Sequence, residues 1–272
     1  MNYFLDLIPS KTFIEELSKY NNQNNIILNI YIKQLPSMNI NKFLYIDIKD
    51  YEKIIREVRK NDFKINIVFD TFCLGNKEFS IQGREILETL DKVMKEKPEF
   101  VTITNNFYYR YIKTHYENVK LICSEYTEIN NVQKINRYLE DLESSGVKLD
   151  TLLLKDRKQM KYISSKFDKN NIYINVNKRG YKNNIYKDTL NNNIAHYIQK
   201  EEWENIEKLL TQYKKECEKQ GQQMVELNQE DIDYLIGLGF NNLWYYDVEN
   251  NPDKYLQDIQ NFLDVETLQF TA

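Results

Sequence analysis

Two carboxylates, Asp70 and Glu125, are the leading candidates for acid–base chemistry. Asp70 ends the apolar run KINIVFD, and Glu125 comes directly after the run VKLICS. A carboxylate beside a partly apolar pocket can have a raised pKa, which suits it to proton transfer. Capping of the following helix is an equally simple role for each, because acidic side chains stabilise helix N-termini. We expect Asp70 and Glu125 to act as an acid–base pair if the fold brings them together.

His196 is one of only two histidines in the chain and is a third candidate for catalysis. Histidine titrates near neutral pH and serves as a base or as a metal ligand. The patterns HxH, HxxxH and HExxH are absent, which argues against a closed zinc site. A looser site for a divalent cation would combine Asp70, Glu125 and His196. A structural role is the alternative for this histidine.

Basic side chains follow two further apolar runs. Lys155 and Arg157 follow one run, and Arg179 follows the next. An arginine fork matches carboxylate and phosphate groups, so these loops predict the binding of an anionic substrate. A solvated charged surface explains them equally well. The other polar residues that follow predicted strands, and that we expect to contact substrate, are Asn105, Ser124, Asp156 and Asn177.

The three cysteines exclude several cofactors. Cys73, Cys123 and Cys217 form no CxxC pair, so a zinc ribbon, a thioredoxin motif and a cysteine-ligated iron–sulfur cluster are not expected. No GxSxG motif supplies a serine nucleophile, and Cys73 is the cysteine to test for reactivity. The N-terminus MNYFLDLIPSK lacks a secretory pattern, which together with this cysteine usage favours the cytoplasm. The sequence identifies no cofactor.

Composition limits the partners. The 272 residues are 42% hydrophobic and 29% charged, with a net charge of −4. Such a chain can build a core, and it has no general attraction to nucleic acid or to anionic lipid. No apolar run approaches the roughly 20 residues that span a membrane. We expect no membrane partner, and nucleic acid is not favoured as a partner.

These residues need elements that position them. Eight short apolar runs alternate with amphipathic helical patterns, as in a (β/α)8 barrel of about 250 residues. An open doubly wound sheet is the alternative, but no GxGxxG follows any run. We predict one domain over residues 1–272, with residues 1–25 as an N-terminal cap, and with all the candidates at the carboxyl end of the barrel. The predicted strands are Ile26–Lys33, Phe43–Asp47, Lys64–Asp70, Phe100–Thr104, Val119–Ser124, Asp150–Lys155, Ile172–Asn177 and Asn242–Asp247.

Four segments resemble the peptidase family U32, the collagenase-like peptidases. FVTITNNFYYRYIKTHYENVKLICSEYTEINN is similar to a pair of consecutive strands in that family, the second ending in Ser124. YLEDLESSGVKLDTLLLKDRKQMKYI is similar to its helix, Gly-Val-Asp joint and charged strand end. IYINVNKRGYKNN is similar to the strand that precedes the family's cysteine cluster, and LNQEDIDYLIGLGFNNLWYY to its last unit. His196 lies where the cluster segment commonly ends in histidine.

The resemblance implies a TIM barrel with hydrolase activity on a peptide, or a modification of peptide or RNA. It departs from the family between Tyr181 and Lys187, where no cysteine is present, so no iron–sulfur cluster is expected. The first hypothesis is an enzyme that acts on an anionic small molecule, a peptide or an RNA. The second is a non-catalytic barrel that forms a homo- or hetero-oligomer with a related chain. The third is an RNA-associated protein that uses the basic loops.

Overall fold

The computed structural model of the chain describes residues 1–21, 24–71, 81–127, 129–177, 180–181, 187–222, 224–246 and 251–270. The strands are β1 (Asn2–Asp6), β2 (Asn25–Ile32), β3 (Tyr45–Ile46), β4 (Lys64–Phe69), β5 (Phe100–Ile103), β6 (Lys120–Cys123), β7 (Gly146–Lys148), β8 (Ile172–Asn175), β9 (Gly180–Tyr181), β10 (Met224–Val225) and β11 (Asn242–Tyr245). The helices are α1 (Lys11–Asn21), α2 (Ile48–Lys60), α3 (Ile81–Met94), α4 (Asn106–His115), α5 (Val132–Asn136), α6 (Thr151–Leu154), α7 (Arg157–Lys166), α8 (Lys187–Gln199), α9 (Trp203–Lys219), α10 (Gln229–Gly237) and α11 (Pro252–Phe270), with short helical turns at η1 (Lys42–Leu44), η3 (Glu125–Thr127), η4 (Arg137–Asp141) and η5 (Lys169–Asn171). Across these ranges, every helix is too short or too polar to cross a membrane.

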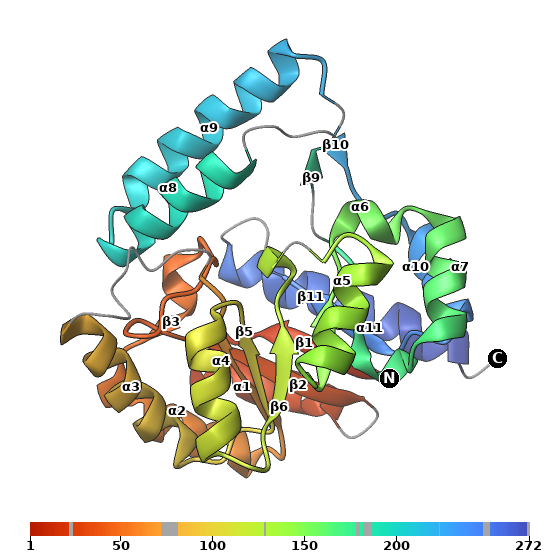
Figure 1. Ribbon diagram of the computed structural model, residues 1–272. Coiled ribbons are helices and arrows are strands. Elements are labelled where there is room, and N and C mark those ends of the chain that lie inside the picture. The colour runs from red at the N-terminus through yellow and green to blue at the C-terminus, as the bar shows by residue number, and fades with distance from the viewer. Residues whose placement is uncertain are drawn as a thin grey trace.

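Eight parallel strands close into a barrel, and helices surround it (Figure 1). Around the ring the strands run β1, β11, β8, β7, β6, β5, β4 and β2, and β2 pairs again with β1. All eight neighbouring pairs are parallel. This topology confirms the (β/α)8 barrel that the sequence predicts.

Three sequence-based assignments are wrong in detail. Residues 1–25 do not cap the barrel, because β1 pairs with both β2 and β11 as a barrel strand. Segment 43–47 contributes only β3, which lies beside the end of β2 and outside the ring. Segment 150–155 is helix α6, because the side chain of Asp150 accepts a hydrogen bond from the backbone N–H of Leu152 and caps it. The barrel strand is the preceding three-residue β7.

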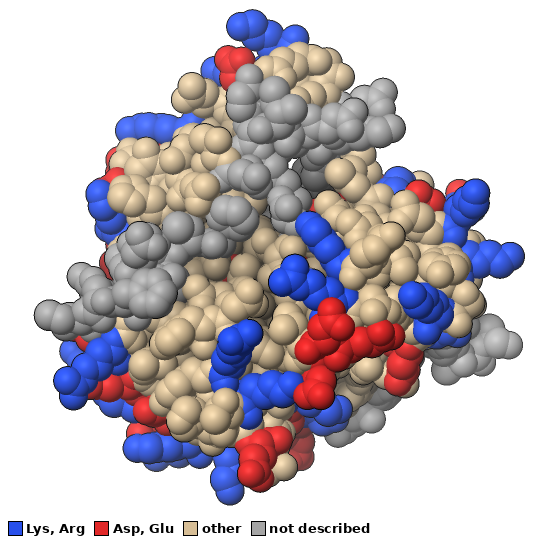
Figure 2. All heavy atoms as spheres, viewed as in Figure 1, with Lys and Arg blue, Asp and Glu red and all other residues tan. Residues whose placement is uncertain are grey.

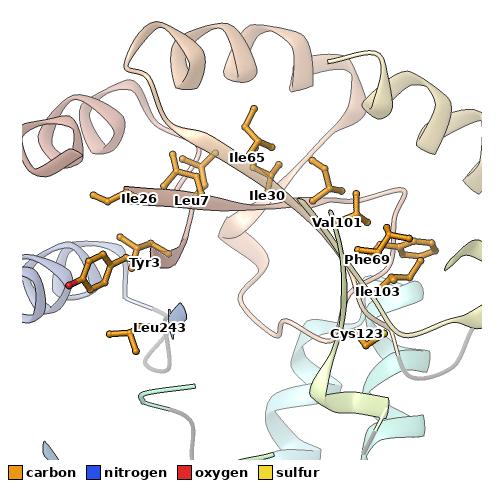
Figure 3. Close-up of a cluster of buried hydrophobic side chains, with 14 of the residues drawn as sticks. Tyr3, Leu7, Ile26, Ile30, Ile65, Phe69, Val101, Ile103, Cys123 and Leu243 are labelled. Atoms are coloured by element: carbon orange, nitrogen blue, oxygen red, sulfur yellow. The ribbon is translucent and has the colours of Figure 1, made fainter. Parts of the chain in front are cut away.

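The strands alternate between two buried surfaces. One set of side chains, including Ile65, Val101 and Leu243, packs outward against the helices (Figure 3). The other set, which includes Phe4, Ile122 and Trp244, fills the barrel interior. Because side chains on a strand alternate between its two faces, the residues two positions beyond the interior set also point inward at the carboxyl end. That end, called the mouth below, is where enzymes of this fold place their active sites.

Two glycines have conformational or packing roles that a side chain would disturb. Gly239 adopts a φ of +92° just after α10, as expected for a residue that ends a helix. Gly146 has a different role, because it lies inside β7. A Cβ at position 146 would overlap the ring of Tyr173 and stand 3.1 Å from the carbonyl oxygen of Asn171. The absence of a side chain lets β7 and β8 approach at this point.

A helical hairpin is inserted between β8 and α10. It consists of α8 and α9, and the antiparallel pair β9–β10 lies at its base (Figure 1). Its residues Ile194, Ile198 and Ile206 are buried in the same cluster as the barrel interior. At the edge of the mouth, the rings of Trp203 and Tyr45 lie 5.5 Å apart. The hairpin therefore covers part of the mouth with an apolar surface.

Candidate active site

Asp70 lies at the mouth, directly after β4, and is 3% exposed. Its Oδ1 accepts hydrogen bonds from the Ser37 hydroxyl at 2.6 Å and from the Met38 backbone N–H at 3.1 Å. Its Oδ2 accepts from the Ser124 hydroxyl at 3.2 Å. All three donors are neutral. Asp70 is therefore a buried carboxylate that is held in place by hydrogen bonds.

Ser124 joins Asp70 to Glu125. Its hydroxyl lies 3.2 Å from Asp70 Oδ2 and 3.2 Å from Glu125 Oε2. A hydroxyl carries one proton, so Ser124 donates to only one of the two carboxylates at a time. The sequence-predicted acid–base pair is thus brought together by a residue that was expected only to contact substrate. The Ser124 hydroxyl therefore links the two carboxylates by a hydrogen bond to one or to the other.

Lys148 supplies a buried positive charge beside Glu125. The Lys148 side chain is fully buried, and its Nζ lies 2.8 Å from Glu125 Oε2. The same Nζ donates to the hydroxyl of Tyr246 and stands 3.6 Å from the centroid of the Trp244 ring, a cation–π contact. The Tyr246 hydroxyl donates in turn to Glu125 Oε1 at 2.9 Å. We call Asp70, Ser124, Glu125, Lys148 and Tyr246 the mouth cluster.

The tyrosine hydroxyls at the mouth remain protonated. Burial, and next to it the charge of Glu125, raises the pKa of Tyr246 well above its ordinary value. Burial and the charge of Asp6 do the same to the pKa of Tyr31, and burial with the charge of Asp70 to that of Tyr45. A neutral hydroxyl is a hydrogen-bond donor toward a carboxylate. Tyr246 and Tyr31 donate to the carboxylates of Glu125 and Asp6 and so stabilise negative charge at the mouth. The Tyr45 hydroxyl donates instead to the backbone carbonyl oxygens of Ser37 and Asn39.

A ladder of hydrogen bonds runs along the inner wall of the barrel below the mouth, across the adjacent strands β5, β4, β2 and β1. The hydroxyl of Thr102 donates to Asn66, the amide of Asn66 donates to Asn29, and the amide of Asn29 donates to Asp6 Oδ1 at 3.1 Å. The Tyr31 hydroxyl also donates to this oxygen, at 2.7 Å. All four residues of the ladder are fully buried. The ladder fixes the orientation of Asp6, the third carboxylate at this end of the barrel.

Lys155 and Arg157 lie outside the mouth cluster. Lys155 Nζ contacts Asp231 at 2.5 Å, and Arg157 contacts Glu230 at 2.6 Å. These acidic partners belong to α10, on the outside of the barrel. Their charges are paired there, and the structure does not bring Lys155 or Arg157 to the mouth cluster.

Three further expected side chains have structural roles. Asn105 caps α4 by accepting hydrogen bonds from two backbone N–H groups, and Asp156 caps α7 in the same way from Gln159. That bond and a second one from the Gln159 side chain lower the pKa of Asp156. Asn177 is half-buried and exchanges two hydrogen bonds with the Tyr246 backbone, at 2.6 and 2.9 Å. Asn177 therefore holds Tyr246, a member of the mouth cluster, in position.

His196 does not reach the cluster. It is exposed on α8, and its ring lies 6.0 Å from that of Tyr197. Within the described residues, no three His, Cys, Asp or Glu side chains come together as metal ligands. The looser cation site of Asp70, Glu125 and His196 is therefore not formed. Arg179 and Cys73 lie outside the described residues.

Sequence reasoning missed Lys148, Tyr246 and Asp6. Lys148 was hidden because β7 has only three residues and precedes a longer leucine run. Asp6 is missed because the sequence pattern predicts a cap, and not a barrel strand, for residues 1–25. Tyr246 follows a strand that was predicted, and the period-2 alternation from Trp244 would have placed it inside the barrel.

Comparison with solved structures supports the architecture. The U32 peptidase Mk0906 superposes with a TM-score of 0.64, over 93% of this chain and 94% of that chain, at 13% identity. A D-psicose 3-epimerase from Clostridium cellulolyticum, solved with D-tagatose, gives a TM-score of 0.43 at 9% identity, over 90% of this chain and 84% of that one. No family model and no curated protein sequence matches the chain. The chain is therefore a (β/α)8 barrel with the fold of a U32 peptidase.

Proposed function

We propose that the chain is a barrel enzyme that hydrolyses a peptide or a related amide by proton transfer at the mouth cluster. The observation that carries the proposal is the Ser124 hydroxyl between two buried carboxylates, 3.2 Å from each. The shared fold with a U32 peptidase supports the choice of substrate. Lys155 and Arg157 pair with acidic residues of α10, and Arg179 lies outside the described residues, so the proposal does not depend on an anionic substrate.

The two carboxylates have different surroundings, which suggests different roles. Glu125 is paired with Lys148, so its negative charge is compensated. Asp70 receives hydrogen bonds from neutral donors and is the group that takes the proton from an attacking water. The oxygen of that water adds to the amide carbonyl carbon. The carbon–nitrogen bond then breaks, and the proton passes to the leaving nitrogen.

The test is an assay for peptide cleavage. Purified protein is incubated with denatured collagen and with a mixed peptide library, and new amino termini are identified by mass spectrometry. Asp70→Asn and Glu125→Gln are each expected to lower the rate by about 100-fold or more, because a positioned acid or base contributes roughly that much. Asp50→Asn, at an exposed carboxylate on α2, is the matched control. His196→Ala is also expected to retain activity. No cleavage by the wild-type protein, or full activity in Asp70→Asn, would refute the proposal.

A non-catalytic barrel is the second candidate. The observation that favours it is the burial of the mouth, since Asp70 and Glu125 are only 3% and 4% exposed and the hairpin packs over the barrel interior. A scaffold of this kind should co-purify with a related barrel in fixed stoichiometry from its native host. A monomeric protein that cleaves peptides would exclude this candidate. For the RNA-binding hypothesis, the loop that carries Arg179 lies outside the described residues, and on the face in Figure 2 basic and acidic side chains are intermixed.

A further inference from the structure

Three polar atoms deep in the barrel have no hydrogen-bond partner within the described part of the chain. They are Nδ2 and Oδ1 of Asn175 and Nε1 of Trp244. Both side chains are fully buried. Buried polar groups are nearly always satisfied, so an unpaired amide and an unpaired indole N–H next to each other call for an explanation. One explanation is a bound ligand that supplies the missing hydrogen-bond partners.

These atoms lie beside the mouth cluster. Asn175 and Trp244 are register partners on the neighbouring strands β8 and β11, so both side chains point into the barrel. The Trp244 ring contacts Nζ of Lys148, and that Nζ pairs with Glu125. A ligand held by Asn175 and Trp244 would therefore extend toward Glu125, which the Ser124 hydroxyl links to Asp70.

The charges of the mouth cluster indicate which charge the ligand carries. The Glu125 carboxylate is compensated by Lys148. Asp70 is held by two hydroxyls and one backbone N–H, and the described residues give it no cationic partner. A buried carboxylate without a counter-charge is costly. A ligand with a cationic nitrogen would remove that cost and would be preferred to an anion.

We propose that the mouth binds a ligand that carries a protonated amine next to an amide, as the amino terminus of a peptide does. The amine contacts Asp70, and the amide exchanges hydrogen bonds with Asn175 and receives one from Trp244 Nε1. This inference rests on the proposed function and specifies its substrate class.

The test measures binding, so it does not depend on catalysis. The chain has two tryptophans, and Trp203→Phe leaves the Trp244 indole N–H as the single such signal in a proton–nitrogen correlation spectrum. Four probes are titrated at about pH 6.5, where an α-amine is protonated: glycinamide, acetamide, ethylammonium and acetate. Glycinamide is expected to shift the Trp244 signal in a saturable way. Acetamide and ethylammonium should each bind about tenfold more weakly or worse, because each lacks one of the two contacts.

Variants then separate the two contacts. Asp70→Asn is expected to reduce glycinamide binding to the level of acetamide, and Asn175→Leu to reduce it to the level of ethylammonium. Asp50→Asn, the exposed control, should change neither. Acetate binding as tightly as glycinamide, or no shift with any probe, would overturn the inference. The probe comparison uses unaltered Asp70 and Asn175, so it stands even if a variant fails to fold. Binding of glycinamide without peptide cleavage would refute the proposed function and leave this inference intact.

Discussion

Removal of the buried ammonium tests the central interaction of the site. Lys148→Met keeps most of the side-chain volume and deletes the Nζ that lies 2.8 Å from Glu125 Oε2. The two side chains are 0% and 4% exposed, so Glu125 would be left as an uncompensated charge away from water. Breaking a buried pair in this way costs about 3–5 kcal/mol. For a chain of this size, such a loss lowers the melting temperature by on the order of 10 °C.

A surface ion pair of the same length provides the control. Lys113 and Glu143 lie 2.7 Å apart, but their side chains are 41% and 76% exposed. Exposed pairs contribute about 0–1 kcal/mol, so Lys113→Met should be nearly neutral. Urea unfolding monitored by circular dichroism measures both variants. The difference between the two losses of unfolding free energy reports the effect of burial, because the nitrogen–oxygen distances of the two ion pairs are similar.

The double variant Lys148→Met/Glu125→Leu completes the test. Replacing both members of a buried pair by apolar residues is often neutral, so the double variant should recover most of the stability lost in Lys148→Met. Independent effects at the two sites would instead add. A Lys148→Met protein within about 1 kcal/mol of the wild type, or a double variant less stable than either single one, would refute the reasoning.

Two further predictions concern the frame of the barrel. Gly146→Ala should destabilise the protein by about 1–3 kcal/mol, because its Cβ would overlap the ring of Tyr173. Gly237→Ala, which meets no atom within 4 Å, should stabilise it by roughly 0.5 kcal/mol, and equal effects in urea unfolding would contradict this contrast. For Asp231, burial alone would raise the pKa. The hydrogen bonds from Lys155 and from the Asn228 backbone amide outweigh burial, so the pKa in the folded state lies below the ordinary value. Its stabilising effect is therefore present above about pH 4 and is lost as the pH falls through the folded pKa. Asp231→Asn should be less stable than the wild type at neutral pH, with a gap in urea midpoint that closes toward pH 2; a gap independent of pH would contradict the assignment.

The architecture could be predicted because parallel barrel strands have a strong signature. Runs such as KINIVF in β4 are buried on both faces and are apolar almost throughout. The same rule failed at β7, which is three residues long and includes a lysine. A hydrophobicity pattern does not place a charged side chain inside a barrel, because the burial of Lys148 depends on its ion pair with Glu125, which follows a different strand, β6.

The site was predictable only in part. Asp70 and Ser124 follow recognisable strands, and Glu125 comes next in the chain, so the rule for barrel mouths found them. The rule also selected Asn105 and Asp156, which cap helices. A polar residue that follows a strand also precedes a helix, and the sequence alone does not separate the two roles. Which side chains meet across the barrel depends on strand register, which only the structure provides.

The ladder from Thr102 to Asp6 has a direction. A carboxylate only accepts, so the last asparagine must turn its NH₂ group toward Asp6, and each amide before it must follow the same sense. One ionised group at the rim thus sets the polarity of dipoles on three neighbouring strands. Protonation of Asp6 would give that carboxyl group a proton to donate, so both amides could reverse, and a change of charge on β1 would reach β5, three strands away around the ring.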